Sequence, residues 1–324
     1  MSRIGRVSMD GSGLPKYGEL PKAGATDVRH AWDVFGPGDD LGTLNLLTDA
    51  RVAAAAAEIR TGTRIGLQLP AELPDPPFYG REALQHKQFQ TGRNGWDDRL
   101  DAFHPQGSTQ WDGFRHVRFR EFGFYGGQTA DPPELGERLG IQHWAKAGIV
   151  GRGVLLDVRR WLEHQGSPPS AFTGRSVSAE ELRRVADWQD VAVRPGDVLC
   201  VRTGWIGEYR ALDRKAREEV AAGGRPSATG LAAGEEMAEQ LWDWHVAAVA
   251  CDNPAVEVAP GDPSVGSLHR RALAALGIPL GELFDFDALA DACAEDGRWS
   301  FFFLSVPLSI SGAAGSPAAP VAVR

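Results

Sequence analysis

The stretch FHPQGSTQWDGFRHVRF, residues 103–119, concentrates side chains that can move protons or hold a polar ligand. Asp112 and His116 lie four positions apart, so they share a face in a helix and can also converge in a loop. A carboxylate beside an imidazole orients the ring and stabilises its protonated form. Gln106 and Gln110 add amide groups that suit a carbonyl or a developing oxyanion. These residue types allow a metal site, a metal-free acid/base site or a polar loop that satisfies its own hydrogen bonds.

The same stretch resembles the signature of the cyclase family, which includes kynurenine formamidases and isatin hydrolases. That signature is HxxxHxDxxxH, in which two His and the Asp bind zinc or manganese and the last His is the acid/base. The register places Gln106, Gln110, Asp112 and His116 at those positions. The Asp and the last His match, whereas Gln stands at both metal-binding His positions. The resemblance implies an enzyme with His116 as its general acid/base.

The resemblance also implies a second ligand pair, a His and a Glu about a dozen residues apart. LHRRALAALGIPLGEL supplies His269 and Glu282 in that arrangement. On a helix, His269 shares a face with apolar residues, so we expect it to point inward. We therefore expect this pair to meet Asp112 and His116 around one cavity, although the two groups lie far apart in the chain.

The departure from the signature leaves metal dependence open. Of the implied ligands, one His (His269) and two carboxylates (Asp112 and Glu282) remain. The amide oxygen of Gln110 is a weak, neutral ligand that suits Mn or Mg better than Zn. His104 is a candidate to replace a lost metal ligand, because it precedes Gln106 by two positions and residues two apart on a strand share a face. Without a cation the two carboxylates repel each other, and at least one holds a proton near neutral pH.

The elements that must position these residues can be predicted from periodicity and caps. TDARVAAAAAEIRTG predicts a helix capped by Thr48 or Asp49, and SAEELRRVADW predicts a helix with a capping box. SVGSLHRRALAALG, closed by Gly277, and FDALADACAED predict two more helices. VLLDV, RPGDVLCVRTGW, VAAVACDN and a final FFFLSVPLSI predict strands. Residues 70–115 show no clear periodicity and are expected to form a long loop.

Strands and helices alternate without a repeat of roughly 20–50 residues, which indicates an α/β or α+β domain. DDLGTLNLL, GIVGRGVLLDV, GDVLCVRTGW, VACDNPAVE and GSPAAPVAV also resemble the cyclase family, from about residue 30 to the C-terminus. The resemblance implies an α/β fold, a swivelling β/β/α domain of the cyclase/kynurenine formamidase type around a mixed sheet. We expect an N-terminal arm over residues 1–30, a single catalytic domain over residues 31–324, and a homo-oligomer, either dimer or tetramer.

Four other residues have both a functional and a structural interpretation. Arg202 follows a predicted strand and can clamp a substrate carboxylate, or it can pair with an internal acid. Trp111 is a candidate substrate contact, with core packing as the alternative for the ten Trp residues of this chain. Asp252 and Asn253 follow a strand, where residues face ligand crevices or form turns.

Composition limits the partners. The net charge of −9 argues against nucleic acid, because a phosphate-binding surface needs a basic excess. No apolar run approaches the ~20 residues that span a bilayer, and the N-terminus lacks the apolar core of a signal peptide. The three Cys are far apart and suit buried thiols in a reducing cytoplasm. We expect a cytoplasmic protein whose partner is a small-molecule substrate.

Three functional hypotheses follow. The first is a cyclase-family hydrolase or cyclase that makes or breaks a C–N or C–O bond beside a carbonyl, with an ion-bound water as nucleophile if Mn or Zn is present. The second is a metal-independent cyclase or dehydratase of a secondary metabolite, in which Asp112 or Glu282 acts with His116. In that enzyme Gln106 and Gln110 hold the substrate carbonyl. The third is a non-catalytic binding protein.

Overall fold

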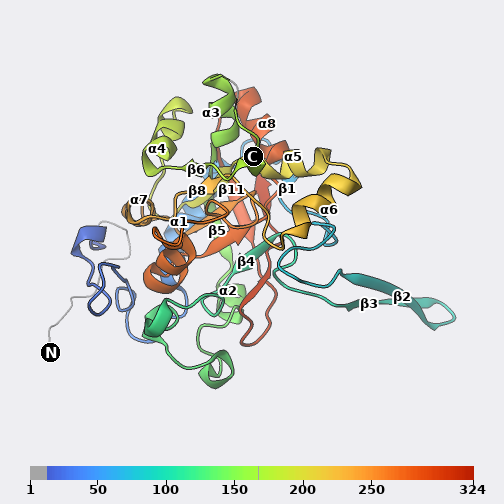
Figure 1. Ribbon diagram of the computed structural model, residues 1–324, viewed down its shortest axis with the longest axis horizontal. Coiled ribbons are helices and arrows are strands. Elements are labelled where there is room, and N and C mark those ends of the chain that lie inside the picture. The colour runs from blue at the N-terminus through green and yellow to red at the C-terminus, as the bar shows by residue number, and fades with distance from the viewer. Residues whose placement is uncertain (1–12, 167) are drawn as a thin grey trace.

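A nine-stranded mixed sheet organises the chain in this computed structural model, which describes residues 13–166 and 168–324. The strand order is β1-β13-β11-β5-β7-β9-β10-β4-β12, and the helices α3, α4 and α8 gather at one end of the molecule (Figure 1). Strands β5, β7, β9 and β10 are parallel to one another, whereas β11 and β4 pair antiparallel on either side of them. The predicted α/β fold around a mixed sheet is confirmed.

The strands of this sheet are short at its edges and longer in its centre. They are β1 (Arg64–Gly66), β4 (Gln110–Asp112), β5 (Ile149–Asp157), β7 (Val198–Arg202), β9 (Ala248–Cys251), β10 (Leu280–Glu282), β11 (Ser300–Ser305), β12 (Gly315–Pro317) and β13 (Val321–Val323). Two small sheets pair β2 (Gln85–Gly92) with β3 (Gly95–Asp101) and β6 (Ser176–Val177) with β8 (Gly230–Leu231).

Helices cover the sheet and connect its strands. They are α1 (Asp49–Ala55), α2 (Gln142–Ala147), α3 (Val158–His164), α4 (Ala179–Trp188), α5 (Trp205–Ala211), α6 (Arg214–Ala222), α7 (Glu235–Asp243) and α8 (Asp287–Asp296). Short 3-10 turns are η1 (Tyr17–Glu19), η2 (Gly42–Leu46), η3 (Ala56–Glu58), η4 (Arg120–Phe122), η5 (Tyr125–Gly127), η6 (Pro132–Leu135) and η7 (Ala171–Thr173). The segment η8 (Arg270–Leu276) is a π-helix.

The predicted caps are present. The Thr48 hydroxyl accepts the Arg51 backbone N–H and so starts α1. Ser178 and Glu181 form the predicted capping box of α4. Gly277 ends η8 with a φ of 67°, a conformation that favours glycine. The sequence therefore predicts these helix ends through local hydrogen bonding alone.

Two predictions of local structure are wrong. The expected loop over residues 70–115 contains the hairpin of β2 and β3, which projects from the body (Figure 1), and the short strand β4. The turn consists of Arg93 and Asn94 between the paired Gly92 and Gly95, and the signal was this cluster of Gly and Asn. In addition, FFFLSVPLSI is not the last strand, because β12 and β13 follow it and pair with β4 and β11.

The core lies where the parallel strands are covered on both faces. All residues from Val198 to Val201 in β7 and from Ala248 to Cys251 in β9 are fully buried, as expected for central parallel strands. The described part of the N-terminal arm packs on α7, where the Trp242 indole N–H donates to the Pro15 carbonyl at 2.8 Å. Within the described ranges, no helix has the length and apolar character that a membrane crossing requires.

Candidate active site

Strand pairing brings together two segments that are distant in the chain. In the antiparallel register of β4 and β10, Gln110 faces Glu282 and Asp112 faces Leu280. Side chains alternate along a strand, so Gln110 and Asp112 share one face of β4. The Gln110 amide Nε2 donates to Glu282 Oε2 at 2.7 Å. The sheet itself therefore fixes the relative positions of these three polar side chains.

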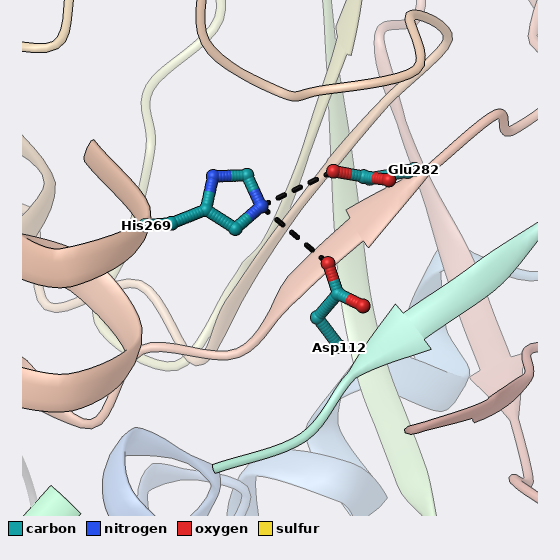
Figure 2. Close-up of side chains that lie close together, drawn as sticks. All are labelled: Asp112, His269 and Glu282. Atoms are coloured by element: carbon teal, nitrogen blue, oxygen red, sulfur yellow. Dashed lines mark hydrogen bonds and ion pairs between the residues drawn. The ribbon is translucent and has the colours of Figure 1, made fainter. Parts of the chain in front are cut away.

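His269 completes this group from the residue before η8. Its Nε2 lies 3.1 Å from Glu282 Oε1 and 3.4 Å from Asp112 Oδ2, and Figure 2 shows the imidazole pointing at both carboxylates. The π-helix that begins at Arg270 is a form that occurs often at functional sites. The structure thus brings the predicted downstream pair, His269 and Glu282, to Asp112.

Glu257 is a member of this group that the sequence analysis missed. Its Oε2 accepts hydrogen bonds from the backbone N–H of His269 and from His269 Nδ1, both at 2.8 Å. The hydroxyl of Ser267 donates to the other oxygen, Oε1, at 2.9 Å. The stretch VACDNPAVE resembles the cyclase family, but the sequence alone gives no role to its final residue, Glu257. Glu257 fixes the orientation of the His269 ring.

Backbone strain flanks both of these carboxylates. Val256, before Glu257, has a φ of 54°, and Leu283, after Glu282, has a φ of 56°. Branched residues rarely adopt this left-handed conformation, which costs about 1–3 kcal/mol per residue. Since Val256 and Leu283 are buried in the surrounding core, packing holds the two carboxylates in place against this cost.

His116 reaches the group from the turn after β4. Its Nε2 lies 3.7 Å from Asp112 Oδ1, and its ring centroid lies 6.5 Å from that of His269. The His116 side chain is 31% exposed, whereas Asp112 is fully buried. His116 is therefore the group that combines contact with the buried acid and access to solvent.

These residues form the floor and wall of a cleft of about 840 Å³. His116, His269, Glu257 and Glu282 line it, together with Tyr79 and several arginines. The Tyr79 hydroxyl donates to the Pro254 carbonyl at 2.7 Å. A cleft of this size accommodates a small organic molecule.

The charges in the cleft are strongly coupled. Burial raises the pKa of Asp112, but the opposing effect of His116 and His269 is larger. The pKa of Asp112 therefore lies below its ordinary value. Burial and the charge of Asp112 raise the pKa of Glu282. Burial lowers the pKa of His269, but Glu257 and the other acids outweigh this and raise it well above the ordinary value. The arrangement favours a charged Asp112, a cationic His269 and a Glu282 that keeps its proton to higher pH.

Three buried oxygen atoms of this group have no hydrogen-bond partner within the described part of the chain: both carboxylate oxygens of Asp112 and Oε1 of Gln110. Unpaired buried acceptors are costly and indicate a cation or a donor from a ligand. Because the free atom of Gln110 is an acceptor, it suits a cation or a donor rather than the substrate carbonyl that the sequence analysis assigned to it.

The donor set fits a divalent cation. One ligand atom each from Asp112, His269 and Glu282 lies within 4.8 Å of the others. The contact of His269 Nδ1 with Glu257 leaves Nε2 free to ligate, which is the usual outer-shell arrangement of metal-binding His. Two carboxylates, one imidazole and the Gln110 oxygen suit a hard ion such as Mn²⁺ better than Zn²⁺.

Two residues predicted to contact substrate do not reach the cleft. Trp111 points to the opposite face of β4, is fully buried, and donates its indole N–H to Ser305 Oγ at 2.8 Å. The alternation of a strand explains this placement, because neighbours of Asp112 must face the other way. Arg202 pairs with the internal acids Asp157 at 3.1 Å and Asp287 at 2.9 Å. Trp111 is thus a core residue, and Arg202 fulfils the structural alternative.

Gln106 and His104 also lie away from the cleft floor. The Gln106 amide packs closely against Gly315 in β12. A Cβ atom placed on Gly315 would lie only 2.8 Å from Gln106 Nε2. His104 lines a separate cavity of about 220 Å³, and its Nε2 accepts the Glu82 backbone N–H at 3.3 Å. A turn at residues 104–107, closed by a hydrogen bond from the Gly107 N–H to the His104 carbonyl, removes the strand geometry that a ligand at His104 requires.

The chain matches the Cyclase family model over residues 67–258, a span that holds Asp112, His116 and Glu257 but ends before His269. A crystal structure described as a novel cyclase is 31% identical, has a TM-score of 0.79, and covers 91% of this chain and 99% of its own.

Two more distant structures share the fold. Isatin hydrolase A from Labrenzia aggregata, bound to benzyl benzoate, is 13% identical with a TM-score of 0.57, covering 85% of this chain and 98% of its own. Isatin hydrolase A from Ralstonia solanacearum is 14% identical with a TM-score of 0.55, and the match covers 85% of this chain and 97% of that protein. No curated protein gives a significant match. The family model and the 31% identical structure together establish that this chain belongs to the cyclase family.

Proposed function

We propose that this protein is an enzyme that makes or breaks a C–N or C–O bond next to the carbonyl of a small molecule, with His116 as general acid/base. The observation that carries this proposal is the convergence of His116, His269 and Glu282 on one cleft, with the fully buried Asp112 in contact with both imidazoles. Family membership and the fold shared with isatin hydrolases support amide or lactone chemistry.

The protein groups are arranged for proton transfer. In the hydrolytic direction, His116 takes a proton from water while the water oxygen forms a bond to the carbonyl carbon. Asp112, charged and 3.7 Å from His116 Nε2, stabilises the resulting imidazolium. His116 then gives the proton to the leaving nitrogen or oxygen as the C–N or C–O bond breaks. The same steps in reverse close a ring.

A divalent cation, when bound by Asp112, His269, Glu282 and Gln110, would polarise the carbonyl and stabilise its developing negative charge. The unpaired oxygens of Asp112 and Gln110 support this proposal. Binding must displace the protons of Glu282 and of His269 Nε2, because a metal ligand is deprotonated. Since the pKa of each of these groups is raised, Mn²⁺ affinity should increase with pH.

The Glu257→Gln variant is expected to bind Mn²⁺ about 10- to 100-fold more weakly, because outer-shell partners of ligating His have effects of this size. The amide oxygen can still accept both His269 donors but carries no charge, so it leaves the ring less basic. Electron paramagnetic resonance of free Mn²⁺ during a titration measures the affinity without any substrate. Glu163→Gln, a change at a partly exposed acid on α3, is the matched control. Equal affinity in Glu257→Gln and the wild type would contradict the assigned role of Glu257.

A panel of cyclic amides and lactones, with isatin as the first member, tests the function. Proton release reports hydrolysis, and each substrate is assayed after dialysis against EDTA and after addition of Mn²⁺. Turnover of at least one substrate that depends on Mn²⁺ supports metal-assisted hydrolysis. If no cyclic or open-chain amide or lactone turns over in either state, the proposal fails.

A metal-independent cyclase or dehydratase of a secondary metabolite is the second candidate. The observation that favours it is the cationic His269 between three acids, which compensates their charges without an ion. A Glu282 that retains its proton can then act as an acid beside His116. Turnover that survives EDTA and is unchanged by Mn²⁺ distinguishes this candidate from the first.

A further inference from the structure

The wall of the cleft carries four arginines: Arg81, Arg120, Arg225 and Arg270. None of their guanidinium groups makes a hydrogen bond or an ion pair with a described residue. The more deeply buried Arg152 and Arg202 differ, because each pairs with two carboxylates. A guanidinium group carries five donors in a fixed fork and is always charged, so this wall presents unmatched positive charge.

No described acid forms a direct ion pair with these arginines, although the charge of Arg81 contributes to the lowered pKa of Asp112. Glu257 already accepts from His269 and Ser267, and Asp262 accepts from the hydroxyl and backbone N–H of Ser264. Asp112 and Glu282 lie at the floor with His269 between them. The cleft is therefore divided into an acid/base floor and a cationic wall.

The arginines are attached to the segments that carry the floor residues. Arg120 follows His116 by four positions, and Arg270 directly follows His269. Both also line an adjoining cavity of about 170 Å³, which extends the cleft on that side. Arg120 and Arg270 therefore line the same cleft as His116 and His269.

Arg81 is held on the opposite segment by a strained turn. Tyr79 has a φ of 60°, and its backbone N–H donates to the Gly224 carbonyl at 2.7 Å, next to Arg225. The Arg81 guanidinium carbon lies 5.0 Å from the Tyr79 ring centroid, a cation–π distance that limits its rotamers. Since a bulky residue at positive φ is costly, the surrounding contacts enforce this turn and so position Arg81.

We propose that this cationic wall binds a carboxylate group of the substrate, so that the enzyme selects small carbonyl compounds that are also anions. The inference rests on the proposed function, because it places the reacting carbonyl at His116 and Asp112 and the carboxylate at Arg81. The protein as a whole carries a net charge of −9, so an anion is attracted only where positive charge is concentrated. A cleft lined by one sign of charge focuses the field and raises the local concentration of its ligand.

The test uses two probes that cannot be hydrolysed: 4-acetylbenzoate, which has a ketone and a carboxylate, and its neutral analogue 4-acetylbenzamide. Isothermal titration calorimetry of the full chain should give at least about tenfold tighter binding of the carboxylate, as expected for charge-assisted hydrogen bonds. Arg81→Gln should remove about tenfold of that preference, and Arg81→Lys should retain part of it. Raising the NaCl concentration to about 0.5 M should weaken the binding of 4-acetylbenzoate and leave the binding of 4-acetylbenzamide unchanged.

Arg64→Gln is the matched control, because Arg64 is an exposed arginine on β1, at the far end of the sheet from β4. It should leave the binding of both probes unchanged. Equal affinity for the two probes, undetectable binding of 4-acetylbenzoate, or a preference that persists in Arg81→Gln and in Arg120→Gln/Arg270→Gln would overturn the inference. A preference for the carboxylate without turnover of any amide or lactone would instead reject only the proposed function.

Discussion

The Asp112→Asn variant should lose about 10³-fold in turnover, because it removes the buried charge that stabilises the His116 imidazolium and faces His269. Its folded state should be less stable than that of the wild type, because contacts with His269 and His116 hold the pKa of Asp112 below its ordinary value, so the fold stabilises the charged form. Relief of the repulsion with Glu282 offsets part of this loss. Turnover is measured on the best substrate of the panel, and stability by urea unfolding.

Asp197→Asn is the control for removal of a buried carboxylate. Asp197 is 3% exposed, pairs with Arg152 at 2.6 Å, and lies outside the cleft. We expect Asp197→Asn to lower the free energy of unfolding, because it leaves a largely buried guanidinium with a weaker partner, while turnover stays near that of the wild type. If Asp112→Asn retained turnover within about tenfold, the charge of Asp112 would not be part of the mechanism.

The His116→Gln variant should lose about 10²- to 10⁴-fold in kcat/KM, the usual contribution of a positioned general acid/base. Glutamine keeps a polar side chain of similar reach but cannot carry the proton. The pH profile provides a readout that a structural role would not affect. A general base must be neutral to accept a proton, so the pH profile of the wild type should contain a limb that rises with pH. This limb should be absent in His116→Gln.

His143 offers an unusually close control. Its side chain is 31% exposed and its Nε2 lies 3.6 Å from Asp40 Oδ2, values that match the 31% and 3.7 Å of His116 beside Asp112. His143→Gln should keep both the rate and the pH profile. Equal losses in the two variants would mean that His116 acts through general electrostatics or folding rather than by proton transfer.

Local signals explain which parts of the fold could be predicted. The caps at Thr48 and Ser178 and the buried strands β7 and β9 follow from hydrogen bonding and hydrophobicity within a few residues. The hairpin of β2 and β3 was missed because its strands are exposed on both faces and lack an alternating pattern. Its remaining signal was the cluster of Gly and Asn around the Arg93-Asn94 turn.

The site depends on contacts that no local pattern encodes. The resemblance to the family placed His269 and Glu282 beside Asp112, and the pairing of β4 with β10 brings them together. Glu257 could not be assigned, because its position follows from the fold of the segment after β9 rather than from any spacing. Trp111 fulfils the core-packing alternative, because a strand turns neighbours to opposite faces and Trp111 therefore faces away from Asp112.

A double-variant cycle on Asp112 and His116 tests most directly whether the cleft residues form one catalytic unit. Residues that act together in one step lose their effects non-additively. The account predicts that Asp112→Asn/His116→Gln has about the same turnover as the slower of the two single variants. Losses that multiply, so that the double variant falls by the product of the two single effects, would show that the two residues act independently and would contradict the account.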